Sequence, residues 1–90
     1  MTEAGALCEQ ALRERPDNAG AYFLLGLVHD AAGRAVEAED CLNRAIYLDA
    51  AHADALLRLS LMVARRGDAA RAELLRLRAA KAHQRREVTG

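Results

Sequence analysis

The chain has 90 residues, and its 13 acidic and 13 basic residues give a formal net charge of zero. A chain of this length holds one small domain, and its richness in Ala, Leu, Arg and Glu, with one Pro and no Trp, favours helices over sheets. No apolar run approaches the ~20 residues that a membrane-spanning helix needs, and the N-terminus lacks the pattern of a signal peptide. We therefore expect an all-α domain in the cytoplasm, without membrane insertion.

Turn signals divide the chain into five predicted helices, at residues 2–15, 19–32, 35–48, 53–66 and 69–85. Pro16 ends the first helix because proline disfavours a helical residue before it, and Asp17 and Asn18 are good cap residues for the second. Loops of two to four residues make successive helices antiparallel.

The second and fourth predicted helices end in the same way. Gly33 and Gly67 follow them directly, where a left-handed cap is wanted. Asp68 can then cap the fifth helix. The tail at residues 87–90 is expected to fray.

The sequence repeats itself with a period of 34 residues. A shift by this length places Gly33 on Gly67 and Leu25 on Leu59. Small residues coincide as well: Ala4 with Ala38 and Ala72, Ala11 with Ala45 and Ala79, and Ala21 with Ala55. This is the length of the helix–turn–helix unit in tetratricopeptide arrays, which stack their units and present a surface to another protein. The period therefore predicts a binding module rather than an enzyme.

The residues within each period resemble the tetratricopeptide repeat family. Residues 19–52 resemble a full repeat, residues 53–86 a full or capping repeat, and residues 2–18 the second half of a preceding repeat. In the central repeat the resemblance rests on Tyr22, Leu25, Gly26, Gly33, Ala38, Leu42 and Ala45. It implies one domain over residues 1–90, with about five helices stacked as a short right-handed superhelix. Because the first helix of the leading repeat is missing, we expect a part of a longer array or protein.

Some family positions depart from the usual pattern. His29 stands where the family has Tyr, and Ala50 stands where it has its closing Pro. In the last repeat Arg76 replaces an apolar residue, as expected of a terminal helix that faces water.

A narrower resemblance rests on three strings, YFLLGLV at 22–28, AIYLD at 45–49 and RRGD at 65–68. They are similar to the repeat segment that follows the catalytic domain in CheR-type chemotaxis methyltransferases, including the WspC branch linked to surface sensing and biofilm formation. Those enzymes methylate receptor glutamates with S-adenosylmethionine. The resemblance implies a non-catalytic region that docks or regulates such an enzyme. A generic scaffold of another cytoplasmic complex, and a domain for self-association, are the alternatives.

Residues that could carry chemistry do not form a recognisable site in the sequence. Cys8 and Cys41 are not paired as Cys-x-x-Cys, and we expect free buried thiols. His29, His52 and His83 lie far apart without metal-ligand spacing, and His29 is interpreted as a packing substitute for Tyr. No Gly-rich phosphate loop or nucleophile with a neighbouring base is present. We therefore predict no catalytic residue, no cofactor and no metal.

The resemblance also implies where a partner would bind. In this fold the first helix of each repeat lines a concave groove, whereas Tyr22, Leu25, Leu56 and Leu59 face the core. The repeat register places seven residues in the groove: Phe23, Leu27, Asp30, Asp54, Leu57, Leu61 and Arg65.

The chemistry of this groove narrows the class of partner. An apolar groove with charges at its rim fits an amphipathic helix. It lacks the Lys, Asn and Arg residues with which carboxylate-clamp repeats hold chaperone C-termini. The candidate partners are a chemoreceptor or the parent catalytic domain. The chain's own last helix, or a second copy in a homodimer, competes for the same strip.

Charge is distributed unevenly along the chain. Residues 1–50 hold nine acids against four Arg, a net of −5, and residues 69–90 hold six bases against two acids, a net of +4. The two ends could dock charged neighbours or simply be solvated. Nucleic-acid binding is not expected, because Glu73 and Glu87 interrupt the basic residues and no aromatic follows Tyr47.

Overall fold

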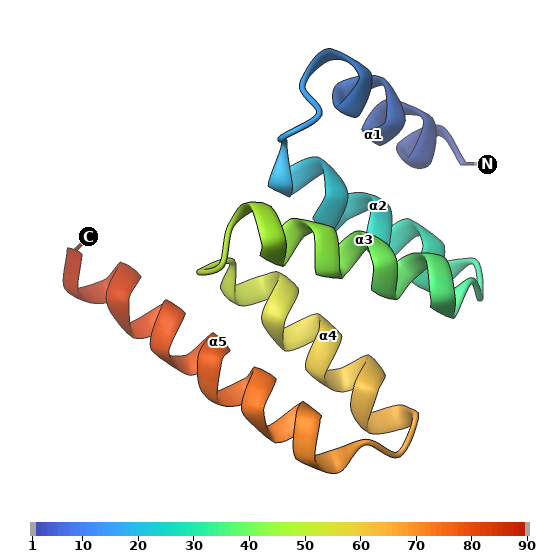
Figure 1. Ribbon diagram of the computed structural model, residues 1–90. Helices are drawn as coiled ribbons and strands as arrows, with labels where there is room; N and C mark the ends of the chain where they lie inside the picture. Colours follow the sequence, from blue (N-terminus) through green and yellow to red (C-terminus); the bar gives the residue numbers. More distant parts are fainter. Residues whose placement is uncertain (1, 90) are drawn as a thin grey trace.

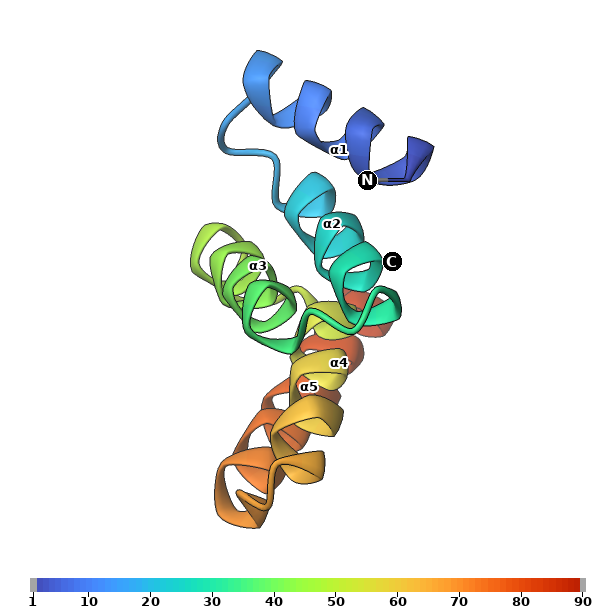
Figure 2. The same ribbon diagram turned by 90° about the vertical axis from the view of Figure 1, so that its right-hand side faces the viewer.

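The computed structural model describes residues 2–89, and the side chains of residues 2–85. Its five helices confirm the predicted all-α fold: α1 (Glu3–Glu14), α2 (Ala19–Ala31), α3 (Ala35–Leu48), α4 (Ala53–Arg65) and α5 (Ala69–Thr89). Figure 1 and Figure 2 show two helical hairpins, α2 with α3 and α4 with α5, with α1 packed at one end of the stack. The stack is flat, with extents of 34 × 33 × 16 Å.

Side-chain caps define where the helices begin. The backbone N–H of Ala21 donates to Asn18 Oδ1 at 3.0 Å, and that of Ala55 donates to His52 Nδ1 at 3.1 Å. Asp68 caps α5 as predicted, because its Oδ1 accepts from Arg71 N at 3.2 Å. These acceptors satisfy N–H groups that have no partner within the helix.

The two predicted glycine turns are confirmed. Gly33 has φ of +77° and Gly67 has φ of +98°, in the left-handed region that side chains rarely adopt. In the first turn Arg34 N donates to His29 O at 2.9 Å, and 34 residues later Asp68 N donates to Val63 O at 3.1 Å. The sequence period is thus reproduced in the hydrogen bonds of the main chain.

The core lies between the helices of the two hairpins. Its members are apolar and buried, and they include the small residues of the 34-residue period: Ala38, Leu42, Ala45, Ile46, Ala55, Leu56, Leu59, Met62, Val63, Ala72, Leu75, Ala79 and Ala82. Leu25 is also buried, and Tyr22 is half-buried against this cluster. At Gly26 an added Cβ would lie 3.1 Å from Leu42 Cγ, so α2 and α3 approach each other closely there.

The predicted end of the last helix needs correction. The helix was expected to end at residue 85 with a frayed tail at 87–90, but α5 continues to Thr89. Neither Gly nor Pro interrupts residues 69–89, and this stretch therefore offers no stop signal. Gly90 lies outside the described residues.

Candidate protein-interaction surface

The first helices of the two full repeats, α2 and α4, contact each other at both of their ends. Near their starts the rings of Phe23 and His52 lie 4.9 Å apart between centroids. Near their ends Arg65 Nη2 lies 3.4 Å from Asp30 Oδ2. Three of the predicted groove residues, Phe23, Asp30 and Arg65, therefore lie where α2 approaches the two ends of α4.

The apolar members of this set differ in exposure. Phe23 and Leu27 on α2 are half-buried. Leu57 and Leu61 on α4 are 47% and 50% exposed. Leucines that remain this open are not needed to fill the core, so they are available to a partner.

The predicted groove residues do not converge on one hollow. Phe23 and Asp54 line a hollow of about 570 Å³ between α1, α2 and the start of α4. Asp30 and Arg65 line a second of about 250 Å³, and Leu61 lines a third of about 240 Å³. Leu27 and Leu57 line none of these three. We call the seven predicted residues the strip; their hollows are separate, which suits an elongated partner better than a small molecule.

Several residues beside the strip were not predicted. Leu7 on α1 and Leu24 on α2 are exposed and line the hollow beside Phe23. The structure leaves Leu7 open because α1 packs on α2 through residues such as the buried Gly5 and Cys8. Arg66 Nη1 lies 2.9 Å from Glu39 Oε1 and ties α4 to α3. Such a pair across repeats has no local sequence signal.

The two thiols lie close to the predicted positions. Cys8 is buried, Cys41 is half-buried, and both are free. Burial raises the pKa of the Cys8 thiol. Burial also raises the pKa of Cys41, and the negative charge of Asp40 raises it further. Thiolates are the reactive form of cysteine, so neither environment resembles that of an activated nucleophile.

Histidine and acidic side chains do not assemble a centre for chemistry in the described part of the chain. His29 is buried, as expected of a residue in the Tyr position, and its Nδ1 has no hydrogen-bond partner among the described residues. His52 instead caps α4. Within residues 2–89 no three His, Cys, Asp or Glu side chains are grouped to hold a metal ion. No described helix combines the length and apolarity needed to cross a membrane.

Sequence comparison agrees with this architecture. A tetratricopeptide repeat family model matches residues 1–60, which is most of the chain. The chain belongs to the tetratricopeptide repeat family, whose helical hairpins stack into binding surfaces.

Two curated proteins are similar to this chain. It is 44% identical over 79 residues to the "Probable biofilm formation methyltransferase WspC" of Pseudomonas aeruginosa PAO1, and 38% identical over 80 residues to the protein of the same name from Pseudomonas putida KT2440. The matches cover 88% and 89% of this chain but 19% of each relative. The chain thus spans about one fifth of the length of these methyltransferases.

Proposed function

We propose that the chain is a non-catalytic protein-interaction module of a CheR-type, S-adenosylmethionine-dependent protein-glutamate methyltransferase in the cytoplasm. It docks the enzyme on a chemoreceptor or contacts the parent catalytic domain. The similarity to WspC methyltransferases supports this parentage. The interaction needs no cofactor, because binding rests on surface complementarity.

The observation that carries the proposal is the half-exposed pair Leu57 and Leu61 on α4. Successive turns of one helix present them side by side, since residues four apart share a helix face. Asp30 and Arg65 form their ion pair at the far end of α2 and α4. An amphipathic helix that lies along this strip would bury both leucines and be aligned by the charges.

The test compares Leu57→Asp/Leu61→Asp with the wild-type chain. Titration calorimetry with the separate methyltransferase domain, and with a chemoreceptor cytoplasmic fragment, should show binding to one of them that weakens by about tenfold or more in the variant. Val36→Asp is the matched control, because Val36 is exposed on α3 outside the strip. Circular dichroism should show unchanged helicity in both variants. Binding that survives the double substitution would refute the groove assignment.

A self-association role makes the opposite prediction in sedimentation equilibrium. If the strip binds another protein, we expect residues 1–90 to remain monomeric across a wide concentration range. A dimer that is weakened by Leu57→Asp would instead assign the strip to contacts between copies.

A further inference from the structure

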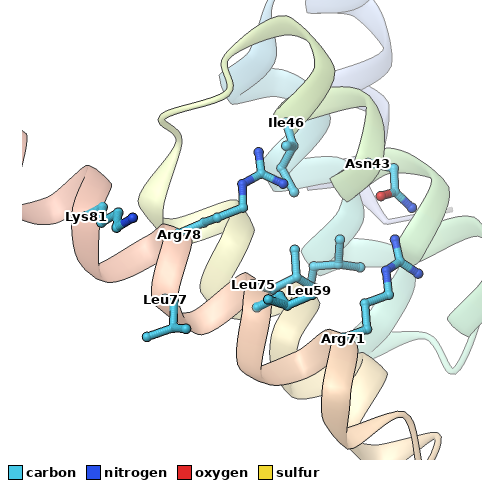
Figure 3. A pocket seen from close by; sticks show the side chains of 9 residues that line it. Asn43, Ile46, Leu59, Arg71, Leu75, Leu77, Arg78 and Lys81 are labelled. Atoms are coloured by element: carbon cyan, nitrogen blue, oxygen red, sulfur yellow. The ribbon is translucent and has the colours of Figure 1, made fainter.

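A further hollow lies beside the second hairpin and is separate from the predicted groove. Its volume is about 480 Å³, and it lies between α3, α4 and α5. Its nine lining residues share no member with the groove: Asn43, Ile46, Leu59, Arg71, Leu74, Leu75, Leu77, Arg78 and Lys81. Figure 3 shows Arg71 and Arg78 extending from α5 toward Asn43 and Ile46 on α3. The apolar floor is thus flanked by basic side chains.

Two leucines on α5 stay open beside this floor. Leu74 is 63% exposed and Leu77 is 53% exposed. Among the described side chains of α5, the buried ones are instead Ala72, Leu75, Ala79 and Ala82. The core of the hairpin is therefore complete without Leu74 and Leu77.

The 34-residue period shows that the fold itself does not require this chemistry. The same face of α3 is solvent-exposed and polar at the equivalent positions. Glu37, Asp40, Asn43 and Tyr47 of α3 correspond to Arg71, Leu74, Leu77 and Lys81 of α5. These four positions thus carry acidic or polar residues in α3 and basic or apolar residues in α5, whereas Arg78 corresponds to the equally basic Arg44. The difference indicates a specific use of α5.

The charge of the hollow is also uncompensated. No acidic residue is among those that line it. Among the described side chains, no ion pair involves Arg71, Arg78 or Lys81. The nearest pair on the same helix, Glu73 with Arg76, belongs to the lining of a different hollow. Three cations around an apolar floor therefore face solvent.

We infer that this hollow is a second docking site, and that it binds an acidic amphipathic helix of a partner protein. The apolar face of that helix would cover Leu74 and Leu77, and its carboxylates would meet Arg71, Arg78 and Lys81. A concave floor built from three helices favours an inserted side chain over a flat lipid surface. Exposed leucines without any aromatic residue in the lining disfavour nucleic acid, which binds through stacking and phosphate contacts. The site shares no residue with the groove, so it stands whether or not the groove assignment holds.

The test uses a fluorescein-labelled model peptide of about 18 residues, helical, with Leu on one face and Glu on the other. Its matched control carries Lys in place of Glu. Fluorescence anisotropy with residues 1–90 should detect binding of the Glu peptide, and the Lys peptide should bind at least about tenfold more weakly. Arg71→Glu/Arg78→Glu should weaken the Glu peptide by at least about tenfold. Arg13→Glu/Arg58→Glu, with the same change in net charge on exposed residues elsewhere, should change affinity less than about twofold.

The contribution of Leu74 and Leu77 is tested by replacing them with the residues that α3 carries at the equivalent positions. Leu74→Asp/Leu77→Asn copies the equivalent residues of α3, and we expect unchanged helicity with at least about tenfold weaker peptide binding. Absence of Glu-peptide binding, or equal loss in both Arg double variants, would overturn the site. So would binding to phosphatidylglycerol vesicles in place of the peptide, or a dimer that the leucine graft dissociates.

Discussion

The two hairpins share their helix order and their glycine turns but carry different side chains at equivalent positions. In the first, Leu42 is fully buried and packs against Gly26, where α2 and α3 approach each other closely. In the second, the equivalent residues are Arg76, which is exposed and paired with Glu73, and the buried Ser60. The first hairpin packs against α1 on one side and α4 on the other, whereas the second hairpin leaves the charged Arg76 exposed at the position equivalent to Leu42. The 34-residue period sets the hairpin, and single residues decide which of its faces are covered.

The largest expected difference between the repeats comes from Leu42→Ala and Arg76→Ala. The first leaves a cavity in a filled core and should lower the free energy of unfolding by about 2–5 kcal/mol. The second truncates an exposed side chain and should change it by less than about 0.5 kcal/mol. Urea unfolding followed by circular dichroism measures both, and comparable losses would show that the second repeat is packed like the first.

The turn glycines should behave alike, because both have positive φ. Gly33→Ala and Gly67→Ala should each destabilise the chain by about 1 kcal/mol, since a Cβ is strained in that conformation although space is open there. Gly20→Ala is the control, because Gly20 lies within α2 with ordinary backbone angles, and no loss of stability is expected. Thermal unfolding of the three variants compares them directly, and unequal losses at the two turns would break the equivalence of the repeats.

A smaller effect is expected from the ion pair between Arg66 and Glu39. It joins α4 to α3, but half of the Arg66 side chain is exposed, so Glu39→Gln should cost less than about 1 kcal/mol. The loss should shrink in about 1 M salt, where charges are screened. Glu73→Gln is the matched change in the second repeat, where the pair lies within one helix, and less than about 0.5 kcal/mol is expected. A larger loss from Glu73→Gln in chemical denaturation would contradict the assignment of Arg76 to a solvated end.

The negative charge on α3 can be tested through the reactivity of Cys41, because Asp40 raises the pKa of this thiol. Its raised pKa means less thiolate at pH 8, so alkylation by iodoacetamide should be slower than for the cysteine of an unfolded peptide. Asp40→Asn removes a negative charge, which lowers the pKa and should accelerate alkylation by up to about fivefold at low salt. Cys41 remains partly buried in this variant, so its alkylation rate should stay below that of the cysteine of an unfolded peptide. Mass spectrometry of time points measures this rate, with Cys8 as the internal reference, and no acceleration would argue against an acidic α3 face.

Most of the fold was accessible from sequence because its signals are local. Asp68 and Gly67 mark a helix start and a helix end through their own backbone preferences, and the structure confirms both. The end of α5 was predicted too early because no residue between 69 and 89 marks a stop. The use of His52 Nδ1 as a helix cap was missed because histidine is not a preferred cap.

The candidate sites were less accessible. The register placed Leu57 and Leu61 in a predicted groove, and both are about half exposed in the structure, but the hollow beside α5 was missed. Its leucines gave no signal in the sequence, because apolar spacing alone cannot say which of several apolar positions a helix buries. In α5 that choice follows from contact with α4, where Ala72, Leu75 and Ala79 meet the core.

The sequence by itself determined the five helices, their glycine turns and their 34-residue repetition, because propensity, caps and left-handed turns act within a few residues. The tertiary structure alone decided which helix faces are buried and which remain exposed to solvent. Asn43, Leu59 and Arg78 come from three helices, and Glu39 and Arg66 from two, so their meeting depends on how the hairpins cross. Packing of this kind is a property of the whole stack, since each helix is positioned by the neighbours that bury its apolar side.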